Sequence, residues 1–187
     1  FIRKNSRFLG FGFLLTFICN FGQTFLIGLY NNDIRTEFGL SNGDFGSLYG
    51  LATLCSAAAL IWVGRIIDHV DLRFYTIAAI ILMICACLLM WQANSIVIIG
   101  IVLFMLRLSG QGMMPHISNT SMGRYFEAAR GRAVSITQLG ISFGQMVLPA
   151  TCITSIALLG WQQSWLAYAV FLMLSLIHIS EPTRQAS

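Results

Sequence analysis

An arginine in the middle of an apolar stretch is the residue of this sequence most able to do chemistry. Arg107 stands in the string Arg107-Leu-Ser-Gly110-Gln111-Gly112 and is the only charged residue deep inside such a stretch. An ionised guanidinium at membrane depth costs at least about 2.5 kcal/mol unless it faces a water-filled cavity or a polar partner. The sequence therefore predicts that Arg107 borders a path for a solute or an ion.

Polar residues at helical spacing accompany Arg107 and extend this predicted path. Gln111 and Ser118 lie four and eleven residues after Arg107, so on a helix they share its face. The first and fifth apolar stretches carry two further polar stripes, formed by Thr16, Asn20, Gln23 and Thr24, and by Gln138, Ser142 and Gln145. A path lined by amides, hydroxyls and a fork-shaped guanidinium suits a small anionic or zwitterionic solute.

A structural role for Arg107 is an open alternative at this point. Polar side chains inside a membrane commonly hydrogen-bond across a pair of helices, so Arg107 could bond backbone carbonyls or the amides of Asn20 and Gln23. Support of proton coupling, without contact to the solute, is equally compatible with the pattern. The sequence leaves direct ligand contact and these supporting roles undecided.

The elements that must position these residues are membrane-spanning helices. The chain is 57% hydrophobic and only 10% charged, and its mean hydropathy is +0.76. These values are far from those of an average soluble domain. A helix that crosses the hydrocarbon core uses about 20 residues, so 187 residues have room for about six spans. We expect an all-α membrane protein with six transmembrane helices.

Six apolar stretches of the required length follow one another along the chain. They cover residues 8–30, 45–67, 74–90, 95–122, 131–159 and a stretch that begins near 161. Polar turns are expected between them at 31–44, 65–73, 92–95, 124–132 and 160–164. Pro115 lies inside the fourth stretch and is expected to kink it, because proline lacks a backbone donor and clashes with the preceding turn.

The distribution of basic residues indicates the orientation in the membrane. Eight arginines and lysines precede the first span or lie between spans two and three and spans four and five: Arg3, Lys4, Arg7, Arg65, Arg73, Arg124, Arg130 and Arg132. The opposite side has Arg35 alone. Because cytoplasmic loops retain basic residues, the N-terminus is expected inside, in a bacterial plasma membrane. The same asymmetry explains the net charge of +4, so no nucleic-acid partner is implied.

Neither a cofactor nor a metal is expected, and the sequence has no visible catalytic machinery. The five cysteines, Cys19, Cys55, Cys85, Cys87 and Cys152, all fall in apolar spans and have no histidine or carboxylate at ligand spacing. There is no nucleophile elbow, no phosphate-binding loop and no zinc-protease helix. We therefore expect that the protein is not an enzyme, and that an ion gradient or the solute gradient supplies its energy.

The end of the chain differs from the rest. The string that begins at Leu174 and runs to Arg184 resembles the conceptual translation of a sequencing-library adapter. Residues 1–173 are therefore interpreted as a transporter unit and residues 174–187 as a non-native tail, with the sixth span ending after Met173. A natural short amphipathic tail is the alternative.

Two motifs indicate a family. The loop Gly64-Arg-Ile-Ile-Asp68-His-Val-Asp71-Leu-Arg73 resembles the signature Gly-x-x-x-Asp-Arg-x-Gly-Arg-Arg of the major facilitator superfamily, with matches at Gly64, Asp68 and Arg73. In the fourth span, Arg107-x-x-Gly110-x-Gly112 resembles the family's Arg-x-x-Gln-Gly-x-Gly. The turn before the fifth span is similar to that of monocarboxylate and oxalate/formate transporters.

This resemblance implies roles for both motifs. In the family, the loop glycine permits close helix approach, and the aspartate caps a helix of the other half and pairs with the loop arginine. Carried over, Gly64, Asp68 and Arg73 would form a conformational lock. Small residues at helical spacing are expected to allow close helix packing, namely Gly46, Gly50, Gly110, Gly112, Gly140 and Gly144.

The resemblance also implies an architecture and a function. We expect the N-terminal six-helix half of a twelve-helix carrier, built as two inverted three-helix repeats, whose C-terminal half is missing. Its partners would be a small-molecule solute, a possible coupling ion and the lipid bilayer. The expected function is secondary active transport by alternating access. The alternative is a transporter-like membrane receptor that binds a ligand without moving it.

Overall fold

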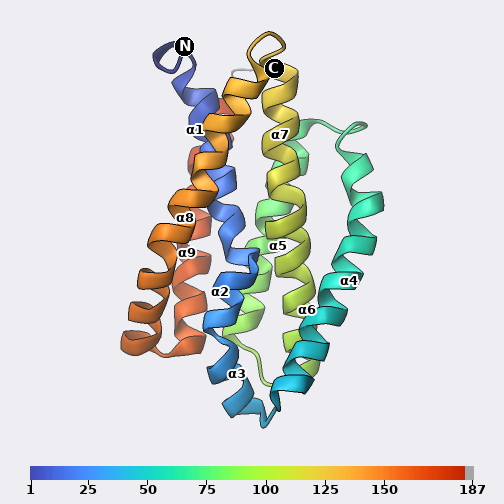
Figure 1. Ribbon diagram of the computed structural model, residues 1–187, viewed down its shortest axis with the longest axis vertical. Helices are drawn as coiled ribbons and strands as arrows, with labels where there is room; N and C mark the ends of the chain where they lie inside the picture. Colours follow the sequence, from blue (N-terminus) through green and yellow to red (C-terminus); the bar gives the residue numbers. More distant parts are fainter. Residues whose placement is uncertain (184–187) are drawn as a thin grey trace.

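The described elements of the chain are all helical, and most run roughly parallel to one long axis (Figure 1). The computed structural model describes residues 1–183, with side chains described through residue 176. The first span comprises a 3-10 turn, Arg3–Asn5, α1, Ser6–Ile18, a second 3-10 turn, Cys19–Gly22, and α2, Thr24–Leu29. The remaining helices are α3, Asn31–Phe38, α4, Asn42–Ile66, α5, Leu72–Trp91, α6, Ile96–Leu106, a π-helix, Arg107–Met113, α7, Met114–Tyr125, α8, Arg130–Leu159, and α9, Trp161–Thr183.

Five of the helical segments in the described residues are long and apolar enough to cross a membrane. They are Arg3–Leu29, Asn42–Ile66, Leu72–Trp91, Ile96–Tyr125 and Arg130–Leu159. Each agrees within a few residues with one of the apolar stretches identified in the sequence. Helix α9 lies where the sixth span is expected. The structure is therefore an all-α bundle of the expected class.

One detail of the expected boundaries is wrong. The polar segment 31–44 is not simply a turn, because α3 occupies most of it and is followed by Gly39, whose φ of 63° only glycine adopts easily. Helix α9 continues to Thr183, and the end of the sixth span after Met173 stays a prediction. The expected tail is thus helical up to Thr183, and residues 184–187 lie outside the described part of the chain.

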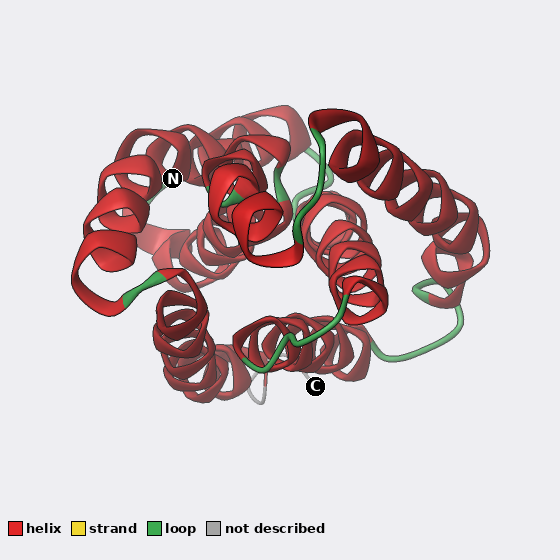
Figure 2. Cartoon of the chain, turned by 90° about the horizontal axis from the view of Figure 1, so that it is seen from below, coloured by secondary structure: helices red, strands yellow, loops and turns green. Residues whose placement is uncertain are grey.

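The helices pair in a pattern that relates the first three spans to the last three. Helix α1 packs most extensively against α8, α5 packs against α9, and α4 packs against α6 and the π-helix. If spans one, two and three are exchanged with spans four, five and six, the packed pair of spans one and five becomes the packed pair of spans four and two. This is the pairing that two three-helix repeats produce. Seen end-on, the helices are arranged in a ring (Figure 2).

Helices α4 and α8 are less buried than the other spans. Only 11% of the apolar window of α4 and 17% of that of α8 is buried, whereas the other three candidate spans are 50–56% buried. Their outward residues include Leu54, Trp62, Met146 and Leu158, each more than 60% exposed. An apolar surface of this extent requires lipid or another protein surface to cover it.

Local sequence explains where the helices begin. Ser41 and Asp44 form a capping box at the start of α4, in which each side chain accepts a hydrogen bond from the other residue's backbone. Ser95 accepts from the backbone of Ile98 and begins α6 in the same way. Asp71 accepts from the backbone of Arg73 at the start of α5. These caps hold the short connections at both ends of the bundle.

Candidate functional site

Two irregular segments meet in the interior of the bundle. The first span breaks between α1 and α2, where Gln23 takes an extended conformation with φ −81° and ψ 150°. The fourth span widens into the π-helix at Arg107–Met113, immediately before Pro115. Proline cannot donate a hydrogen bond and crowds the carbonyl four residues earlier, so a π-helical turn relieves that crowding. The π-helix thus lies directly before the turn that contains Pro115, and the kink expected at this proline stays a prediction.

Gly22 and Gly110 allow these two segments to touch backbone to backbone. A Cβ atom at Gly110 would lie only 2.7 Å from the Cα and nitrogen of Gly22. A Cβ atom at Gly22 would overlap the carbonyl oxygen of Leu106. Any larger residue at either position would push the two spans apart. The sequence indicated Gly110 as a packing residue, whereas Gly22 carried no motif that marked it.

The guanidinium of Arg107 lies at this crossing. Its Nη1 donates to the carbonyl oxygen of Gly22, 3.2 Å away, and to the Oγ1 of Thr24, also 3.2 Å away. Its Cζ lies 5.2 Å from the ring centroid of Tyr49 on α4, in the geometry of a cation–π contact. The hydroxyl of Tyr49 is hydrogen-bonded to the hydroxyl of Thr24 at 2.8 Å. Spans one, two and four thus hold this side chain together.

Arg107 is nevertheless incompletely satisfied. The residue is only 6% exposed, and its Nε is buried without a hydrogen-bond partner. In the described part of the chain it has no carboxylate within ion-pair distance. A buried cation without a counter-charge is costly. An anionic ligand would accept a hydrogen bond from this unsatisfied donor and would supply the missing negative charge.

The other residues expected to line the path divide into two groups. Gln111 and Gln145 are exposed, and Gln23 is half-buried, with its Nε2 3.9 Å from the Sγ of Cys19. Gln111 lies one helical turn from Arg107 along the π-helix, so it is close enough to share a ligand with it. These residues present amides to the surface of the bundle.

The second group is used for helix packing in this structure. Asn20 is fully buried and donates to the carbonyl oxygens of Thr16 and Phe17. Ser118 is fully buried and donates to the carbonyl oxygen of Gly12, 3.2 Å away. Gln138 donates to the Oδ1 of Asn119 at 3.0 Å. The polar stripes therefore do not all face one path, because Ser118 and Gln138 bond across helix pairs and Asn20 bonds the preceding turn of its own span.

The glycines expected in helix packing also divide. A Cβ atom at Gly140 would overlap α1 at Phe13 and Thr16, one at Gly144 would overlap Asn20 in the 3-10 turn that follows α1, and one at Gly112 would lie 3.0 Å from Leu60. In contrast, a Cβ atom at Gly46 or Gly50 would meet nothing within 4 Å. No described residue packs against Gly46 or Gly50, so the expectation of close helix packing at these two glycines stays a prediction.

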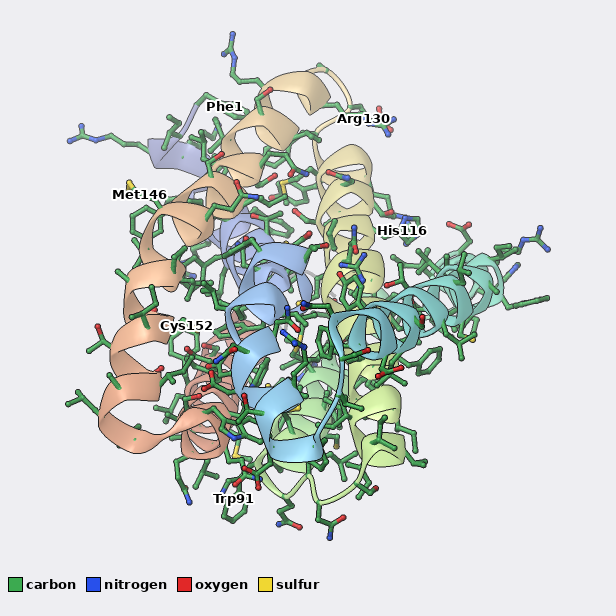
Figure 3. The ribbon with its side chains drawn as sticks, turned by 60° about the horizontal axis from the view of Figure 1, so that its bottom comes forward. Phe1, Trp91, His116, Arg130, Met146 and Cys152 are labelled. Atoms are coloured by element: carbon green, nitrogen blue, oxygen red, sulfur yellow. The ribbon has the colours of Figure 1, made fainter. Side chains whose placement is uncertain are left out.

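The expected lock residues lie at the end of the bundle that contains the N-terminus. Asp68 forms an ion pair of 3.1 Å with the Nη2 of Arg124 on α7, which also donates to the carbonyl oxygen of Ile67. The resemblance implied Arg73 as the partner, whereas the ion pair that Asp68 forms in the described residues is with Arg124, at the end of α7. A Cβ atom at Gly64 would meet nothing within 4 Å, and the carbonyl oxygen of Gly64 lies 3.3 Å from the Nε2 of His116. His116 is labelled in Figure 3.

The comparison with known families agrees with this architecture. The family description Major Facilitator Superfamily matches residues 12–186, which is most of the chain. The chain belongs to the major facilitator superfamily. No curated protein and no solved structure matches it significantly. The match continues through residue 186, and the interpretation of residues 174–187 as a non-native tail stays a prediction.

Membership in the major facilitator superfamily makes this a multi-pass membrane protein of a transporter family, with a small-molecule solute and the lipid bilayer as its partners. In this superfamily member, the described residues include no group of histidine, cysteine and carboxylate side chains that could hold a metal ion. Its five cysteines are all free thiols.

Sequence reasoning missed three residues of this superfamily member's sites. Tyr49 and Gly22 complete the surroundings of Arg107, and Arg124 pairs with Asp68. Tyr49 lies in an apolar span, where an aromatic residue normally reads as packing material. Arg124 was counted only as a loop charge. Its position just before the turn to α8 was the signal that could have placed it opposite the loop of Asp68.

Proposed function

We propose that this protein is a secondary active transporter that moves a small anionic or zwitterionic solute by alternating access. The observation that supports this proposal is the state of Arg107. Its guanidinium is 6% exposed, has a buried Nε without a partner, and meets no carboxylate in the described residues. A carboxylate of the solute would supply both the hydrogen-bond acceptor and the charge.

The neighbours of Arg107 fit the same ligand chemistry. Thr24 and Tyr49 offer hydroxyl groups, and Gln111 offers an amide at the exposed edge of the crossing. The Nη1 of Arg107 is already held by Gly22 and Thr24, which fixes the orientation of the fork before a ligand arrives. Such preorganisation reduces the entropy lost on binding.

The orientation proposed places the N-terminus in the cytoplasm of a bacterial cell. The N-terminal end of the bundle carries Arg3, Lys4, Arg65 and Arg124, whereas Arg35 lies at the other end. Basic residues of short loops are retained on the cytoplasmic side of the membrane. The ion pair between Asp68 and Arg124 would then lie at the cytoplasmic end.

Alternating access requires a second bundle that moves against this one. The weakly buried helices α4 and α8 are the surfaces proposed to receive a second set of six helices. Open space beside Gly46 and Gly50 on α4 would accept a closely packed partner helix. A solute bound at Arg107 would lie between the two bundles, and a coupling ion could accompany it.

Uptake into proteoliposomes tests this function directly. The complete transporter, with its second set of six helices, and its Arg107→Gln variant would be assayed with radiolabelled lactate, oxalate and glycine betaine as probes. We expect saturable uptake of at least one probe by the unmodified protein, and a loss of about 100-fold in Arg107→Gln, because a charge-assisted hydrogen bond is lost from a buried site. Saturable binding without uptake would contradict transport and favour the receptor alternative.

A further inference from the structure

The aromatic ring of Tyr49 on α4 occupies one side of the Arg107 guanidinium. The Cζ of Arg107 lies over this ring, 5.2 Å from its centroid. The Nη1 of the same group is held by the carbonyl oxygen of Gly22 and the hydroxyl of Thr24. The buried Nε has no acceptor and is thus a donor left for a ligand. A ligand that binds there meets the Tyr49 ring as its neighbour.

Two contacts fix the orientation of the Tyr49 ring. Its hydroxyl is hydrogen-bonded to the hydroxyl of Thr24 at 2.8 Å. Its ring lies beside that of Phe45, one turn earlier on α4, with centroids 6.5 Å apart and planes inclined by 19°. Phe45 is only 7% exposed and belongs to the hydrophobic core. A side chain held by a hydrogen bond and by a packed neighbour keeps one orientation, so the ring is a fixed wall.

The exposure of these side chains places Tyr49 on the way to Arg107. Arg107 is 6% exposed, whereas Tyr49 is half-buried and Thr24 is exposed. A solute that reaches the guanidinium from the surface on this side therefore passes along the ring. The ring attracts the cation through its π-system but supplies no negative charge, so a carboxylate is still attracted to Arg107. The ring thus restricts the shape of the ligand and leaves its charge preference unchanged.

We propose that Tyr49 determines which carboxylates Arg107 accepts, by limiting the size of the group next to the carboxylate. The carboxylate binds in the plane of the guanidinium through Nε, and its substituent lies against the Tyr49 ring. A methyl group fits beside the ring, whereas a phenyl group collides with it. Tyr49 is then a specificity residue that Thr24 and Phe45 position. This inference rests on the proposed function, because it takes a carboxylate as the ligand.

Calorimetric titration of the complete transporter with lactate and with mandelate tests the inference. Both probes are 2-hydroxy acids, and mandelate has a phenyl group where lactate has a methyl group. We expect the unmodified protein to bind lactate at least about tenfold more tightly than mandelate, and Tyr49→Ala to reduce this preference to about twofold or less. Tyr49→Phe keeps the ring and is expected to retain the preference within about threefold.

Two further variants make the test independent of folding defects. If Tyr49→Ala does not fold, Tyr49→Leu removes the ring while it keeps apolar volume, and we expect the lactate preference to fall in the same direction. The matched control is Tyr125→Ala. Tyr125 is the last residue of α7 and also lies beside a phenylalanine, Phe8, with ring centroids 3.7 Å apart. This control is expected to keep the lactate preference of the unmodified protein.

Three results would overturn the proposal. One is equal binding of lactate and mandelate by the unmodified protein. Another is an unchanged preference in folded Tyr49→Ala or Tyr49→Leu, even with both affinities lowered, because Tyr49 would then be a structural support only. The third is an equal loss of preference in Tyr125→Ala. Uptake that still depends on Arg107 would leave the proposed function intact in each case, whereas uptake unaffected by Arg107→Gln would contradict the proposed function itself.

Discussion

Two arginines of the fourth span have opposite surroundings in this bundle. Arg107 on the π-helix is 6% exposed and meets a carbonyl, a hydroxyl and an aromatic ring, with no carboxylate in the described residues. Arg124 at the end of α7 pairs with Asp68 at 3.1 Å, and its side chain is 48% exposed. The two residues are seventeen positions apart, or roughly 25 Å along a helix.

The difference shows that the burial of a charged side chain, more than its pairing, decides how much free energy its interactions contribute to stability or to binding. The exposed pair of Arg124 and Asp68 is screened by water and contributes at most about 1 kcal/mol to stability. The buried guanidinium of Arg107 has left most of its water and retains an unpartnered Nε, so any acceptor placed there gains much more. The visible salt bridge is thus energetically minor, whereas the arginine without an ion pair is the position on which function is expected to depend.

The largest effect on stability should come from a change in the backbone contact between Gly110 and Gly22, which places Arg107. Gly110→Ala would set a methyl group 2.7 Å from the backbone of Gly22, so we expect a loss of about 2 kcal/mol in unfolding free energy. The matched control is Gly50→Ala, because a Cβ atom there meets nothing within 4 Å. Thermal unfolding in detergent would measure both. Equal stability of the two variants would show that the spans do not cross this closely.

A smaller effect should follow from removal of one partner of Arg107. Thr24→Val deletes the hydroxyl that accepts from Nη1 and bonds Tyr49, and we expect a loss of about 1 kcal/mol in solute binding or stability. Thr154→Val is the control, because the hydroxyl of Thr154 bonds only its own helix, at the carbonyl oxygen of Ala150. If both variants bind and unfold alike, Thr24 does not orient the guanidinium.

The smallest effect on stability should come from the exposed pair. Asp68→Asn removes the carboxylate that Arg124 meets, and we expect a change of no more than about 0.5 kcal/mol in unfolding free energy. We nevertheless expect it to bias the complete transporter toward opening at the cytoplasmic end. Labelling of a cysteine introduced at that end would measure the opening. Unchanged accessibility would argue against a lock at Asp68.

Much of the fold followed from the sequence because its signals are local. Five spanning segments lie within a few residues of the expected apolar stretches, since a run of apolar residues of this length has few other stable structures in a membrane. The exception was segment 31–44, where α3 forms in a polar sequence. A short polar helix has no apolar run or strong period to reveal it.

The site was harder to predict because it depends on contacts between distant segments. Arg107 could be identified from its charge alone, whereas the importance of Gly22 appears only when the two broken spans cross. Asn20 and Ser118 had the helical spacing of path residues, but packing turned them toward neighbouring helices. Helical spacing defines which residues share a face, and tertiary packing decides what that face meets.

Substitution of Arg107 by lysine tests the central claim most directly. Lysine keeps the positive charge and loses the planar fork that can hold a carboxylate with two hydrogen bonds. In proteoliposomes, Arg107→Lys is predicted to lower the uptake of the best probe solute by at least about tenfold, with the protein still folded. Uptake by Arg107→Lys equal to that of the unmodified protein would contradict recognition of the solute by this guanidinium.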